Sequence, residues 1–77
     1  MAAQLNAKLY GTRFCHLCEE AENILHKIGV TATIIDIVED DNLFEKYSLR
    51  IPVLKRFDND VELDWPFDAA TILRFLM

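Results

Sequence analysis

The chain of 77 residues contains two cysteines, Cys15 and Cys18, with two residues between them. A short strand-like segment, Ala7-Lys8-Leu9-Tyr10, precedes the pair and is closed by Gly11-Thr12, and a stretch with helical periodicity follows. A CxxC motif that opens a helix after a strand is the arrangement in which two thiols can act as a redox pair. We expect Cys15 at the helix N-terminus, where unpaired N–H groups and the helix dipole favour a thiolate, and Cys18 one turn further in and shielded.

Two other roles for the cysteine pair stay open. The first is a buried thiol pair that does not take part in catalysis. A disulfide between the two would close a very small loop and would therefore stabilise the fold little. The second is a metal site. A structural zinc site needs about four ligands, and His26 would lie about 12 Å along the helix from Cys18, so we expect no intramolecular zinc site. A cluster shared between two chains remains an alternative.

Charged side chains around the motif could tune it or bind a substrate. A protonated His16 would favour a thiolate at Cys15, whereas the helix N-terminus disfavours that protonation; an exposed residue of little effect is the alternative. Arg13 and Arg50 could contact an anionic substrate or be ordinary surface residues. The early helix carries Glu19, Glu20 and Glu22, which suit a helix start but oppose a nearby thiolate.

Composition limits the class of protein. Apolar residues make up 52% of the chain, enough for the core of one domain spanning residues 1–77. The net charge of −5 and the scattered Lys and Arg residues argue against nucleic acid as a partner. No apolar run approaches the ~20 residues that span a bilayer, and the polar lead-in of residues 1–6 does not resemble a signal peptide. We therefore expect a cytoplasmic protein, in a compartment where thiols are kept reduced.

The first half of the chain predicts a strand, a helix and a second strand. After the strand at Lys8-Leu9-Tyr10, a helix is expected from Leu17 to Ile28, with Gly29 as its left-handed cap. Its apolar stripe consists of Leu17, Ala21, Ile24, Leu25 and Ile28. The β-branched stretch from Thr31 to Val38 predicts a mostly buried strand.

The second half predicts a helix, a hairpin and a final helix. Asp40 or Asp41 can cap a helix through Tyr47, with Leu43, Phe44 and Tyr47 toward the core. Strands are expected at Val53–Phe57 and Val61–Leu63, on either side of a turn at Asp58-Asn59-Asp60. Asp68 can cap a last helix that runs to Met77. The order β-α-β-α-β-β-α indicates an α/β fold, a mixed four-stranded sheet flanked by helices, with the first two strands parallel.

Several motifs together resemble the glutaredoxins, and in particular small glutaredoxin-like proteins of uncharacterised role. They are Leu9-Tyr10, Cys15-His16-Leu17-Cys18-Glu19, Ile51-Pro52-Val53-Leu54 and Leu63-Asp64-Trp65-Pro66-Phe67-Asp68. The resemblance covers nearly the whole chain and implies a thioredoxin-like fold.

The resemblance also implies roles for individual residues. Cys15 matches the nucleophilic cysteine and Cys18 the resolving one. Pro52, after Ile51, matches the cis-proline that lies beside the dithiol and shapes the substrate groove. Asp68 is the residue that could take the place of the family's glutathione-binding Asp.

The chain departs from the usual glutaredoxin pattern at several positions. His16 and Leu17 replace Pro and Tyr within the motif, and Thr12 stands where a Lys is usual. Asp64-Trp65-Pro66-Phe67 replaces the paired glycines that approach glutathione. Trp65 and Phe67 could line the groove beside the dithiol or only pack the last helix. We expect weak glutathione-dependent activity from these changes.

Taken together, the sequence predicts a monomeric thiol–disulfide oxidoreductase of glutaredoxin-like type. It would hold no bound cofactor and would act on a disulfide-containing protein or a glutathione mixed disulfide. A reductase or glutathione would supply electrons. The alternative is a thioredoxin-fold module without catalytic turnover, which senses redox state or binds other proteins through the same fold.

Overall fold

The computed structural model describes residues 5–77. The polar lead-in expected at residues 1–6 falls mostly on residues 1–4, which lie outside that range, while Asn6 already belongs to the first strand.

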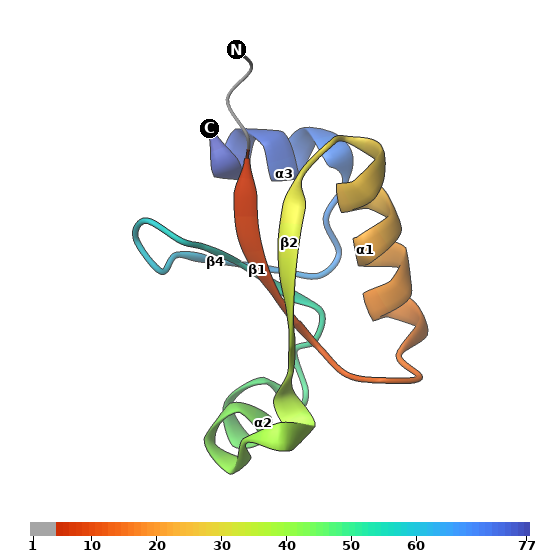
Figure 1. Ribbon diagram of the computed structural model, residues 1–77, viewed down its shortest axis with the longest axis vertical. Helices are drawn as coiled ribbons and strands as arrows, with labels where there is room; N and C mark the ends of the chain where they lie inside the picture. The colour runs from red at the N-terminus through yellow and green to blue at the C-terminus, as the bar shows by residue number, and fades with distance from the viewer. Residues whose placement is uncertain (1–4) are drawn as a thin grey trace.

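Four strands form one mixed sheet in the order β2-β1-β3-β4 (Figure 1). Strand β1 (Asn6–Gly11) runs parallel to β2 (Thr31–Asp36) and antiparallel to β3 (Val53–Arg56). Strand β3 forms a hairpin with β4 (Glu62–Asp64). The predicted element order and mixed sheet are confirmed, with one added 3₁₀ turn, η1 (Ile37–Glu39).

Helix α1 (His16–Lys27) ends as its sequence predicts. Gly29 has a φ of 76°, the left-handed conformation that glycine adopts without steric cost. Its N–H donates to the His26 carbonyl at 3.2 Å, and the Val30 N–H donates to the Leu25 carbonyl at 3.0 Å. These two bonds satisfy carbonyl groups that the helix end leaves without partners.

The other two helices begin at the predicted aspartate caps. Helix α2 (Asp41–Tyr47) starts after Asp40, whose carboxylate accepts from the Asn42 N–H at 2.8 Å. Helix α3 (Ala69–Leu76) starts after Asp68, whose carboxylate accepts from the Thr71 N–H at 2.8 Å. Both bonds satisfy amide donors of a first helical turn.

Two clusters of buried side chains lie on the two faces of the sheet. The larger cluster packs α1 and α3 on one face; its buried members are Ala7, Leu9, Ala21, Leu25, Val30, Leu54, Phe67, Ile72 and Leu76. The smaller cluster consists of Tyr10, Ile37, Tyr47 and Val53. It joins the sheet to α2, which lies beyond the end of β2 (Figure 1).

Three expectations about burial are wrong. Strand β2 is mostly exposed, with Ile34 51% exposed, because it is an edge strand of the sheet. Leu17 is 43% exposed and does not belong to the buried stripe of α1, since it faces solvent on the first turn. Phe44 is half exposed because α2 buries mainly Tyr47 against the sheet.

The strand boundaries differ from the predicted ones by a few residues. Strand β1 is longer than the expected Lys8–Tyr10 at both ends. Strand β2 stops at Asp36, two residues early, because the Asp36 carboxylate accepts from the Val38 N–H at 3.0 Å and starts η1. Strand β4 is shifted by one residue toward Asp64.

Candidate functional site

Cys15 and Cys18 occupy different environments at the start of α1. Cys15 is the N-cap residue and is partly exposed, whereas Cys18 is only 5% exposed. The two are joined in a disulfide, with their Cα atoms 5.2 Å apart. The Cys18 N–H also donates to the Cys15 Sγ at 3.2 Å. A sulfur atom therefore takes the place of the oxygen that usually caps a helix, within reach of its amide donors.

The turn between β1 and α1 brings Cys15 to the surface. Strand β1 ends at Gly11, and residues 12–14 carry the chain over to the helix. Phe14 has a φ of 59°, a left-handed conformation that few bulky residues adopt. The Glu19 N–H then donates to the Cys15 carbonyl at 3.1 Å and closes the first helical turn.

Pro52 lies at the same end of the sheet as the cysteine pair. The Ile51–Pro52 bond is cis, and Pro52 is buried. Tyr10 pairs with Val53 in the antiparallel register of β1 and β3, so the next step of that register places Pro52 opposite Gly11. Gly11 itself packs against Cys18. The register thus places the cis-proline opposite Gly11, the residue that packs against Cys18.

Arg50 is held by two carboxylates of the neighbouring hairpin. Its Nη2 lies 2.8 Å from Glu62 Oε1 and 2.7 Å from Asp64 Oδ1. The hydrogen bond to Asp64, and after it the one to Glu62, raises the pKa of the Arg50 guanidinium above its usual value, so the group stays charged. The contact between Arg50 and an anionic substrate stays a prediction. The Arg50 guanidinium already binds two carboxylates of the same chain.

A tyrosine completes this network next to the cis-proline. The Tyr47 hydroxyl donates to the Glu62 carboxylate, and the Tyr47 ring stacks on Tyr10 at 4.4 Å between centroids. Partial burial alone would raise the pKa of Glu62, but the bonds from Tyr47 and Arg50 outweigh it and lower that pKa. The Ile51 N–H donates to the Tyr47 carbonyl at 3.1 Å. The network therefore fixes the residues that lead into Pro52.

The remaining predicted site residues lie in more ordinary positions. Arg13 is exposed in the turn before Cys15. The His16 side chain is 81% exposed, with Nε2 3.5 Å from Glu20 Oε1. Asp68 caps α3, and the Thr71 backbone bond lowers its pKa. Roles for these three residues in tuning or substrate binding stay predictions.

The aromatic pair after β4 mainly packs the last helix. Phe67 is buried in the larger core cluster, and Trp65 packs against that cluster from its edge. The two rings meet edge to face at 5.0 Å between centroids. The Trp65–Pro66 bond is also cis. These contacts favour the packing role for Trp65 and Phe67.

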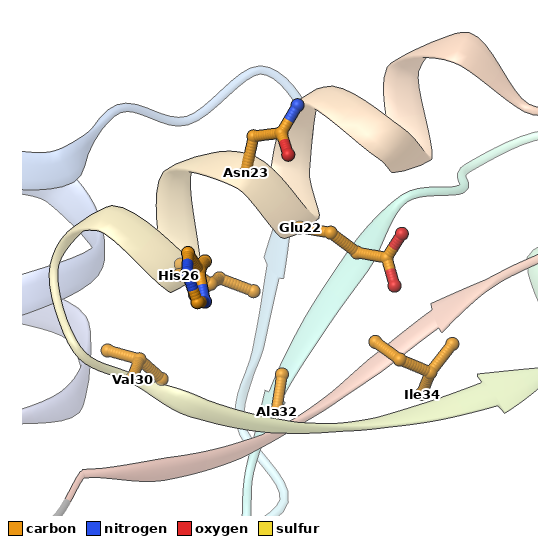
Figure 2. A pocket seen from close by; sticks show the side chains of 7 residues that line it. Glu22, Asn23, His26, Val30, Ala32 and Ile34 are labelled. Carbon is orange, nitrogen blue, oxygen red and sulfur yellow. The ribbon is translucent and has the colours of Figure 1, made fainter.

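A shallow hollow of about 280 Å³ lies elsewhere, between α1 and β2 (Figure 2). The side chain of Glu22 reaches from α1 toward Ile34 on β2 across it. The described residues that line it include neither cysteine; they are Glu22, Asn23, Leu25, His26, Val30, Ala32 and Ile34. The site is therefore organised around an accessible sulfur at a helix end, not around a deep pocket.

Two contacts at the site were missed from the sequence. The first is the packing of Gly11 on Cys18. The sequence signal for it is a glycine between a strand and the CxxC turn, because glycine allows another residue to approach the backbone closely. The Tyr47–Glu62 bond joins residues fifteen positions apart and has no local signal. Within residues 5–77, no group of three or more His, Cys, Asp or Glu could hold a metal ion, and no helix is long and apolar enough to cross a bilayer.

Comparison with known proteins places the fold and the family. The target protein XcR50 from X. campestris, solved by X-ray methods for structural genomics, is 37% identical, with a TM-score of 0.83 over 91% of this chain and 93% of that chain. Protein Ne2328 from Nitrosomonas europaea, solved by NMR, is 28% identical, with a TM-score of 0.81 over 100% and 96% of the two chains. No curated protein matches. The family model described as a glutaredoxin-like domain (DUF836) matches residues 6–77, and the chain belongs to this family.

Proposed function

We propose that this protein is a thiol–disulfide oxidoreductase in which Cys15 is the nucleophile and Cys18 the resolving thiol. The observation that carries the proposal is the asymmetry of the pair: a partly exposed Cys15 at the N-terminus of α1 and a buried Cys18 within disulfide distance. The helix N-terminus favours negative charge on the exposed sulfur, which is the one a substrate can reach.

The proposed cycle has two exchange steps. The Cys15 thiolate attacks one sulfur of a substrate disulfide, forms a mixed disulfide with it, and releases the other sulfur as a thiolate that takes up a proton. Cys18 then loses its proton and attacks the Cys15 sulfur, which forms the Cys15–Cys18 disulfide and releases the second substrate thiol. The substrate gains two electrons and two protons, and the protein dithiol loses them.

The cycle closes when an external thiol reductant reduces the Cys15–Cys18 disulfide. Two molecules of glutathione or one reductase dithiol would supply the two electrons. A protein disulfide or a glutathione mixed disulfide would be the substrate, with a monomer acting in the cytoplasm, where the pair is kept reduced. Pro52 would lie beside the substrate backbone; its position opposite Gly11, which packs on Cys18, supports this role.

The test is disulfide turnover with two reducing systems, glutathione with glutathione reductase and thioredoxin reductase. Turnover with either system, abolished by Cys15→Ser, is the expected result. Cys18→Ser should stop reduction of a protein disulfide and trap the mixed disulfide on Cys15. A Cys15–Cys18 disulfide that neither system reduces rapidly would support the redox-sensing module instead.

A further inference from the structure

Two apolar side chains are exposed on either side of the proposed nucleophile. Phe14 is 100% exposed and Leu17 is 43% exposed. Phe14 precedes Cys15 directly, and Leu17 lies on the first turn of α1 after it. Exposed apolar side chains that flank a sulfur at a helix start offer contact area to the chain that carries the substrate disulfide.

The backbone holds Phe14 in this exposed position. Its φ of 59° is a conformation that a bulky side chain rarely adopts and that persists chiefly at functional sites. The backbone is fixed on both sides of Phe14. Before it, Gly11 at the end of β1 packs on Cys18, and after it, the Glu19 N–H donates to the Cys15 carbonyl in the first turn of α1. The ring is therefore presented to solvent by the same turn that presents Cys15.

The charges near Cys15 favour a cationic partner over an anionic one. Glu19 lies one helical turn beyond Cys15, and Glu20 is exposed beside it. Arg13 is a cation in the same turn, and His16 Nε2 lies 3.5 Å from Glu20 Oε1, so Glu19 is the carboxylate that we consider for a partner. Arg50, which could have bound an anion, is engaged by Glu62 and Asp64 at 2.8 and 2.7 Å.

We infer that the surface formed by Phe14 and Leu17 binds a polypeptide segment of the substrate protein. In this segment, an apolar side chain lies next to the disulfide cysteine, and a lysine or arginine lies close enough to pair with Glu19. This inference rests on the proposed function and names its substrate class. Glutathione fits the surface poorly, because it has two carboxylates and no apolar side chain.

The test uses the reduced full-length protein and three oxidised probes. Two are short peptide disulfide dimers, one with leucine and lysine beside the cysteine and one with serine and glutamate there; the third is hydroxyethyl disulfide, which is small and neutral. Acid quenching and mass spectrometry measure how fast each probe converts the protein dithiol to the Cys15–Cys18 disulfide. Each probe molecule consumed yields two free thiols, so all three report the same two-electron exchange.

We expect the leucine–lysine dimer to react about tenfold faster than the serine–glutamate dimer, from apolar contact and charge together. Phe14→Ala should lower about fivefold the ratio of the rate with the leucine–lysine dimer to the rate with hydroxyethyl disulfide. Phe57→Ala is the matched control, because Phe57 is also exposed but lies beyond β3, toward the far end of β1.

The charge of the probe gives a second, independent test. Glu19→Gln should slow the leucine–lysine dimer and speed the serine–glutamate dimer, whereas Glu22→Gln, the same change further along α1, should do neither. Equal rates for the two dimers, or a Phe14→Ala protein that reacts as the wild type does, would overturn the inference while the oxidoreductase proposal stands. Failure of the wild type to react with any probe would overturn both.

Discussion

Gly11 lies directly against the sulfur of Cys18: a Cβ added at Gly11 would be 3.0 Å from Cys18 Sγ and 3.3 Å from Cys18 Cβ. Gly11 is the last residue of β1, and Cys18 is on the first turn of α1. The strand and the helix therefore meet at Cys18 with no room for a side chain at Gly11. This contact shields Cys18 and sets the distance between the helix start and the sheet.

We predict that Gly11→Ala destabilises the protein by about 1–3 kcal/mol, because the added methyl group must displace Cys18 or the start of α1. Urea unfolding of the oxidised protein measures this change. The displacement should also make Cys18 easier to alkylate in the reduced protein. A stable variant with unchanged Cys18 reactivity would show that the contact can relax at little cost.

Gly29→Ala is the matched control for that variant. An added Cβ at Gly29 meets no atom within 4 Å, but the φ of 76° strains any L side chain. The expected cost is about 1–2 kcal/mol from backbone strain alone. Cys18 reactivity should stay as in the wild type, which separates crowding at the cysteine from a general loss of stability.

The two cysteines should differ in their rates of alkylation. In the reduced protein near neutral pH, Cys15 should react first, because it is partly exposed at a helix N-terminus, while Cys18 is 5% exposed. Brief treatment with iodoacetamide followed by peptide mass spectrometry gives the order. Preferential labelling of Cys18 would reverse the assigned roles of nucleophile and resolving thiol.

Tyr47→Phe should destabilise the protein by about 1–2 kcal/mol near neutral pH, because Glu62 loses a hydrogen-bond donor. Burial, and then the bond and charge of Glu62, raise the pKa of Tyr47 from 10.0 to about 12. The stability linked to this shift is present below pH 10 and is lost as the pH rises toward 12.

The advantage of the wild type over Tyr47→Phe should therefore shrink in that alkaline range. Urea unfolding of both proteins at neutral and alkaline pH measures it. Tyr10→Phe serves as a control, since it changes the stacked ring but keeps the Tyr47–Glu62 bond. A difference between wild type and Tyr47→Phe that stays constant with pH would mean that the bond contributes no linked stability.

Features set by neighbouring residues could be predicted from the sequence. The caps at Gly29, Asp40 and Asp68 depend on the residue at the helix end and the few that follow it. The place of Cys15 at the start of α1 is equally local, because a strand, a glycine and a helical stripe come in order. The element order followed from these signals.

Features set by sheet register could not be predicted in this way. Arg50 meets Glu62 and Asp64 across 12 and 14 residues, and which carboxylate it meets depends on how β3 pairs with β4. The exposure of β2 depends on its place at the sheet edge, which a β-branched pattern does not encode. The pairing of Arg50 with Glu62 and Asp64 therefore has no signal in the sequence around Arg50.

Glutathione should be a poor reductant of this protein. We expect glutathione-dependent turnover about tenfold or more below that of an ordinary glutaredoxin assayed alongside, the loss expected from about one missing polar contact. Trp65-Pro66 stands where glycines would let a backbone approach the ligand, and a proline has no N–H to donate. Arg50 is held by Glu62 and Asp64.

The assay couples glutathione to glutathione reductase, with a glutathione mixed disulfide and a protein disulfide as separate substrates. Robust turnover with glutathione as the only reductant, lost in Cys15→Ser, would contradict the prediction and show that Arg13 and Asp68 compensate. Cys18→Ser separates the two routes. If this variant still reduces the mixed disulfide, Cys15 alone acts on glutathione adducts; if it reduces neither substrate, both sulfurs are required and a protein disulfide is the better substrate.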